Sequence, residues 1–109
     1  MKLFQARSHR KILKKLVSKF PDIKEALIVS NEGMPLNSTL SREIEHVKIA
    51  GIALAILSAA KRIISETKNG TFKQLTIKSS NTYLIGYWLS NKKLLLVVSP
   101  KDISLDVLF

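Results

Sequence analysis

Residues 49–60 read Ile-Ala-Gly-Ile-Ala-Leu-Ala-Ile-Leu-Ser-Ala-Ala, and Ser58 is the only polar side chain among them. At about 100° per residue, this stretch and its flanks form a helix with two apolar ridges. One ridge carries Ile49, Ile52, Ile56 and Ile63, and the other carries Val47, Ala50, Leu54, Leu57 and Ile64. Beside the first ridge lies a row of small residues, Gly51, Ala55 and Ala59. A helix that covers a sheet of its own chain needs one apolar ridge, so the second ridge requires another cover.

This second ridge predicts self-association. Each large aliphatic side chain left in water forfeits about 1.5–3 kcal/mol of burial free energy, and a helix from a second copy is the simplest cover. We assign to the partner the ridge of Val47, Ala50, Leu54 and Leu57, although the sequence leaves open which of the two ridges faces the partner and which the sheet. Two alternatives remain open, in which the N-terminal helix folds over the ridge or the ridge enters a membrane.

The segments around this helix predict five strands. Residues 24–30 and 34–38 form a hairpin around Asn31-Glu32-Gly33, and Pro35 places the second strand at a sheet edge. Ser41 is the expected N-cap of the long helix, which Asn69-Gly70 ends. Three strands of an antiparallel meander follow, over residues 72–79, 82–90 and 93–99.

The burial pattern of the strands predicts three layers. Residues 26–29, 83–89 and 94–98 are apolar at consecutive positions, as in strands covered on both faces, whereas residues 72–79 alternate as in an edge strand. The predicted fold is α/β (α+β), a five-stranded antiparallel sheet in the order α-β-β-α-β-β-β-α. The long helix covers one face and the N- and C-terminal helices cover the other. The 109 residues are expected to form one domain, with a basic helix over 1–19 and a short helix over 101–109.

The net charge of +10 is concentrated at the N-terminus, where residues 1–19 carry seven bases and no acid. The favoured interpretation is an amphipathic helix that packs Ile12, Leu13 and Leu16 on the body and leaves its bases in solvent. The alternatives are a membrane-surface helix that inserts Leu3 and Phe4, and a contact with nucleic-acid phosphates, for which stacking aromatics are scarce. The candidate contacts with anionic lipid or an acidic partner are Lys2, Arg7, Arg10, Lys11, Lys14 and Lys15.

The sequence predicts no catalytic, metal or cofactor site. The absence of cysteine excludes disulfides and thiolate centres, and the glycines match no phosphate-binding motif. His9 and His46, the only histidines, are interpreted as surface or capping residues, and Arg42 and Arg62 as solvated arginines rather than arginine fingers. We therefore expect a non-enzyme. Because the sequence has no apolar run of about 18 residues and no secretory signal, we expect a cytoplasmic protein, with attachment at the membrane periphery left open.

Residues 20–36 read Phe-Pro-Asp-Ile-Lys-Glu-Ala-Leu-Ile-Val-Ser-Asn-Glu-Gly-Met-Pro-Leu. This stretch resembles the opening hairpin of roadblock domains, the family of the roadblock dynein light chain. The preceding helix, the long helix rich in small residues and the three-strand meander are similar too, so the resemblance covers roughly residues 12–106. Longin domains share a related sheet but lack a helix before the first hairpin.

The resemblance implies a homodimer, or a heterodimer with another roadblock chain. In such a dimer the long helices lie side by side and the sheets join through the third strand, here with Gln74, Leu75, Thr76 and Ile77. Roadblock dimers serve as scaffolds or as platforms that regulate small Ras-like GTPases. The expected function is therefore a non-catalytic dimeric adaptor for such a GTPase. The alternative is a basic module that binds nucleic acid or anionic membrane through its N-terminal helix. Two features depart from the family, the short C-terminal segment and the strongly basic N-terminus.

Overall fold

The structure, a computed structural model, describes residues 2–39 and 43–109, with side chains from residues 8–39 and 45–109. The predicted fold class and element order are confirmed within these ranges. The final helix is shorter than predicted. It is a single 3-10 turn, closed by the hydrogen bond from Leu108 N to Leu105 O. The predicted N-cap Ser41 lies outside the described residues. The elements are α1 (Lys2–Lys19), β1 (Glu25–Ser30), β2 (Pro35–Ser38), α2 (Glu43–Thr67), β3 (Gln74–Lys78), β4 (Tyr83–Ser90), β5 (Lys93–Ser99) and η1 (Leu105–Val107).

The five strands form one antiparallel sheet in the order β2-β1-β5-β4-β3. β2 and β3 are its two edges, as Pro35 and the alternating pattern of residues 72–79 predict. The apolar strands β1, β5 and β4 form the centre, where aliphatic side chains such as Ile28, Leu95 and Ile85 are fully buried. The sheet therefore has two faces to be covered.

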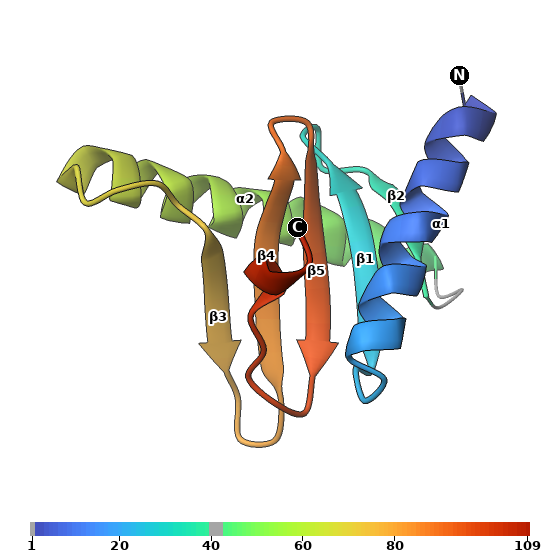
Figure 1. The fold of residues 1–109 in the computed structure, drawn as a ribbon. Coiled ribbons are helices and arrows are strands. Elements are labelled where there is room, and N and C mark those ends of the chain that lie inside the picture. Colours follow the sequence, from blue (N-terminus) through green and yellow to red (C-terminus); the bar gives the residue numbers. More distant parts are fainter. Residues whose placement is uncertain (1, 40–42) are drawn as a thin grey trace.

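Figure 1 shows α1 and the C-terminal segment on one face of the sheet and α2 on the other. α1 packs Leu13 and Leu16 against the sheet, and Leu105 of η1 joins the same cluster. The amphipathic interpretation of the N-terminal helix is therefore confirmed for the described side chains. Leu3 and Phe4, which a membrane-surface helix would insert, lie outside them. The strand residues of this cluster are Ala26, Ile28, Ile85, Tyr87, Leu95 and Val97.

On the other face, α2 packs a stripe of its residues on β1, β4 and β5. Ala50, Ala53 and Leu57 of α2 form a second buried cluster. Leu57 sits on Gly86 of β4, where an added Cβ would lie 2.7 Å from its methyl carbons. The strand residues of this cluster are Leu27, Val29, Leu94 and Leu96. The C-terminal end of α2 extends past β3 (Figure 1), and none of the described helices is long and apolar enough to cross a membrane.

Candidate protein-interaction face

One ridge of α2 is left in solvent. Ile49, Ile52, Ile56 and Ile63 expose 37%, 54%, 39% and 61% of their surface. Leu75 is half-buried and Ile77 is exposed on β3, on the same side of the sheet as α2. We call these six residues the α2–β3 face. The small residues Gly51, Ala55 and Ala59 are also exposed, and a Cβ built on Gly51 would meet no described atom within 4 Å apart from its own stretch of helix.

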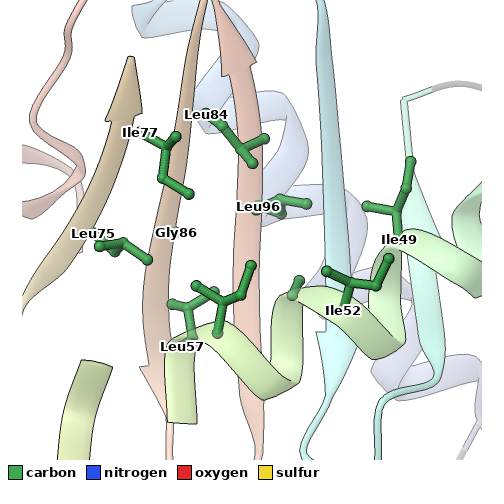
Figure 2. A pocket seen from close by; sticks show the side chains of 10 residues that line it. Ile49, Ile52, Leu57, Leu75, Ile77, Leu84, Gly86 and Leu96 are labelled. Carbon is green, nitrogen blue, oxygen red and sulfur yellow. The ribbon is translucent and has the colours of Figure 1, made fainter. Parts of the chain in front are cut away.

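A hollow lies where α2 and the strands of this face meet. Figure 2 shows Ile49 and Ile52 of α2 and Leu75, Ile77 and Leu84 of the strands around it. Its volume is about 80 Å³, whereas small-molecule sites typically have about 300–1,000 Å³. This hollow therefore suits an apolar side chain of another protein better than a metabolite. Its lining is apolar throughout: Ile49, Ile52, Ala53, Ile56, Leu57, Leu75, Ile77, Leu84, Gly86 and Leu96.

The prediction that the other ridge faces a partner is wrong for its buried members. Ala50 and Leu57 expose 0% and 1% of their surface because they pack on the chain's own sheet. Leu54 is half-buried beside the same cluster, and only Val47 of that ridge is exposed. The apolar pattern alone does not distinguish the two ridges, because both carry large aliphatic side chains.

The four predicted interface residues of β3 divide between the two faces of the sheet. Leu75 and Ile77 line the hollow under α2. Gln74 is turned to the opposite face, where its Nε2 donates to Ile103 O and its Oε1 accepts from Leu105 N, both at 2.9 Å. Gln74 therefore holds η1 in place, a role that sequence reasoning missed. The outer edge of β3 carries no strand partner within the described chain.

Both histidines are buried, so their interpretation as surface or capping residues is wrong. His46 of α2 donates from Nε2 to Glu25 Oε1 of β1 at 2.9 Å, which ties the start of α2 to the sheet. His9 of α1 is 4% exposed, and its Nε2 has no hydrogen-bond partner within the described residues. Burial, and secondly the charge of Lys93, lower the pKa of His9 below its usual value of 6.5.

The remaining polar contacts of the two faces are structural. Tyr87 donates to Asp106 Oδ1 at 3.2 Å, and burial together with this carboxylate raises the pKa of its hydroxyl. Lys61 of α2 lies over the Trp88 ring, 4.9 Å from its centroid. Across residues 2–39 and 43–109, His, Asp and Glu form no group of three that could hold a metal ion. These contacts join elements to one another and form no nucleophile–base pair.

The comparisons with known proteins agree with this geometry. A model of the Roadblock/LC7 domain matches residues 11–99, which is most of the sequence. The chain belongs to the Roadblock/LC7 family. Among proteins with curated functions, no sequence matches significantly.

Solved structures share the roadblock fold at low identity. A Roadblock/LC7 domain from Streptomyces avermitilis has 17% identity and a TM-score of 0.73, over 86% of this chain and 79% of that one. MglB of Myxococcus xanthus has 16% identity and a TM-score of 0.72, over 88% and 80%. The gliding protein MglB of Thermus thermophilus has 13% identity and a TM-score of 0.68, over 83% and 69%. At such identities these relatives establish the fold of this roadblock chain.

The basic residues of α1 in this roadblock chain do not form one uniform patch. Arg10 and Lys14 face β2. Lys15 is turned toward the C-terminal segment, where its Nζ donates to Leu108 O at 2.9 Å and lies over the Phe109 ring. Lys11 is exposed, and the side chains of Lys2 and Arg7 lie outside the described residues. The structure thus separates the predicted contact residues into groups with different surroundings.

Proposed function

We propose that this roadblock chain is a cytoplasmic, non-catalytic scaffold that works as a dimer and binds and regulates a small Ras-like GTPase. The observation that carries the proposal is the α2–β3 face, an apolar surface next to an open strand edge. Its occupant is a second copy of the chain or another roadblock chain.

The free energy of burial supports an assembly on this face. Fully covering one isoleucine contributes about 1.5–3 kcal/mol, so completing the burial of the exposed ridge of α2 supplies several kcal/mol. The open edge of β3 adds main-chain hydrogen bonds when a second β3 pairs with it. One of the solved relatives is MglB in a tetrameric arrangement, which is consistent with self-association in the family.

The non-catalytic part of the proposal rests on the polar groups of the described chain. His46 and Glu25 are engaged with each other between α2 and β1, and Tyr87 and Asp106 are engaged between β4 and η1. The hollow of the α2–β3 face is lined by apolar side chains, which offer no group for acid–base or nucleophilic chemistry. The GTPase is proposed as partner because the chain resembles roadblock dimers that serve as platforms for small GTPases. The chain would offer the GTPase a binding surface.

Self-association is tested by static light scattering at micromolar concentration. The expected mass is twice the 12.2 kDa of one chain. Ile52→Lys should give a single-chain mass because it places a charge in the centre of the α2–β3 face. Val107→Lys is the matched control, since Val107 is also an exposed apolar residue but belongs to η1 on the other side of the sheet. A wild-type monomer would remove the proposed dimer.

GTPase binding is tested by capture from the native cell, with the wild-type chain and Ile52→Lys as baits. The GTPases of the cell extract are loaded with GTP or with GDP before capture. The captured proteins are then identified and their bound nucleotide is measured. We expect a small GTPase with the wild-type chain and less of it with Ile52→Lys. A dimeric wild-type chain that captures no GTPase in either nucleotide state contradicts the GTPase and leaves the dimer standing.

A further inference from the structure

An open groove of about 520 Å³ runs between α1 and β2, at the sheet edge opposite to β3. It shares no residue with the α2–β3 face. α1 supplies one wall, and β2 with the residue after it supplies the other. The lining residues are Arg10, Leu13, Lys14, Val17 and Ser18 on α1 and Asn37, Ser38 and Thr39 on the second wall.

The charged residues described in this groove are all basic. Its described lining contains two bases, Arg10 and Lys14, and no acid. Neither base forms an ion pair with a carboxylate within the described part of the chain. These two bases therefore keep their charge available for an anionic group from outside the chain.

The rest of the lining combines apolar and hydrogen-bonding groups. Leu13 is buried at the base of the α1 wall, while Val17 exposes 41% of its surface. On the opposite wall, Asn37 Oδ1 accepts from Ser38 N at 2.8 Å, and within the described residues the amide Nδ2 of Asn37 donates no hydrogen bond. A ligand in this groove thus meets cations, an apolar side chain and an amide donor.

We propose that this groove binds an acidic segment of a partner protein in an extended conformation. Arg10 and Lys14 are separated by one helical turn, with Cβ atoms about 5–6 Å apart. Side chains two positions apart in an extended peptide point to the same side and lie about 6.6 Å apart. Two carboxylates at alternate positions therefore match the two bases, and a carbonyl of the bound peptide would accept from the Asn37 amide.

The same residues disfavour a membrane or a nucleic acid as the occupant. Leu13, the buried apolar residue of the groove, packs in the core and is unavailable for insertion into lipid. A groove between a helix and a strand is concave, whereas a bilayer surface is broad. Among the described residues no aromatic ring lines the groove, so they offer no platform on which a base could stack.

The binding experiment uses fluorescence anisotropy at physiological salt with the full chain. The probe is a short fluorescein-labelled peptide in which Glu and Val alternate, and its control replaces every Glu by Gln. The test variant is the double substitution Arg10→Ser with Lys14→Ser. The matched control is Lys11→Ser with Lys19→Ser, which removes the same charge from exposed positions of the same helix outside the groove.

We expect the acidic peptide to bind and the Gln peptide to bind much more weakly. The test variant should lose about tenfold or more in affinity, whereas the matched control should lose about threefold or less. NMR titration should shift the backbone amides of Ser18 and Thr39, one on each wall.

Three results would overturn the proposal. Equal losses in the two double variants would assign binding to the overall charge of α1. Binding to phosphatidylserine vesicles or single-stranded RNA, without binding to the acidic peptide, would assign the surface to lipid or nucleic acid. Unchanged amides at Ser18 and Thr39 would place the peptide elsewhere. None of these outcomes bears on the proposed dimer or its GTPase, because the variants leave the α2–β3 face intact.

Discussion

Leu57 of α2 rests directly on Gly86 of β4. A Cβ built on Gly86 would lie 2.7 Å from both methyl carbons of Leu57 and 3.0 Å from its Cγ. Because both branches of the leucine are in contact, rotation of one methyl group cannot relieve the overlap. The missing side chain at Gly86 therefore sets how closely the helix approaches the sheet.

This contact predicts strong coupling between the two positions. Gly86→Ala should lower the free energy of unfolding by about 1–3 kcal/mol through overpacking, and Leu57→Ala by about 2–5 kcal/mol through a cavity. The double variant should be more stable than the sum of the two losses predicts, because the new methyl group occupies part of the cavity. Urea unfolding measures all four proteins, and strictly additive losses would contradict this packing.

Gln74 should control the order of the C-terminal turn. Gln74→Leu leaves Leu105 N–H and Ile103 C=O without their partner and should cost about 1–3 kcal/mol. Gln74→Glu keeps an acceptor for Leu105 N–H and serves as the control. Hydrogen exchange at the Leu105 amide should accelerate strongly in Gln74→Leu and weakly in Gln74→Glu. Equal exchange in the two variants would mean that Gln74 does not hold η1.

His9 should make stability depend on pH. The pKa of His9 is lowered in the folded chain from its usual 6.5, so the unfolded state binds more protons as pH falls below that value. The free energy of unfolding should therefore decrease from neutral pH to about pH 5.5, before most carboxylates titrate. His9→Gln, which leaves His46 unchanged, should flatten the dependence of the free energy of unfolding on pH over this range. A profile identical to wild type would exclude His9 as its source.

The pair of His46 and Glu25 should contribute through a hydrogen bond between a buried imidazole and a half-buried carboxylate. Glu25→Ala leaves the His46 Nε2–H without an acceptor and should cost about 1–3 kcal/mol. Glu25→Gln retains a side-chain oxygen at the same place and should cost less. Thermal unfolding at neutral pH compares the two variants, and a larger loss in Glu25→Gln would contradict the hydrogen bond as the cause.

The layers of the fold could be predicted because they depend on local patterns. Pro35 marks one edge strand and the alternation around Leu75 marks the other, and the structure confirms both. The orientation of α2 about its own axis could not be predicted, since both of its ridges are apolar. Space on the sheet decides it: Gly86 admits Leu57. That information lies on a strand far from the helix in the sequence.

The polar positions were less predictable for a similar reason. His46 is buried where Glu25, on a distant strand, accepts a hydrogen bond from its ring, and no local spacing predicts that contact. The groove between α1 and β2 also could not be predicted from any single segment, because its two walls come from different parts of the sequence. Arg10 and Lys14 read as two of many bases until the hairpin places Asn37 opposite to them.

The two borders of the sheet are chemically unequal. At β2, Pro35 lacks an amide hydrogen, and the outward amide of Ser38 is already taken by its neighbour Asn37. β3 offers the opposite border without such blocking. In the proposed dimer, pairing through β3 would occupy the border that lacks these two features. Pairing through β3 would leave β2 as the free border of each copy, where the proline and the occupied amide disfavour further strand addition and growth into fibres.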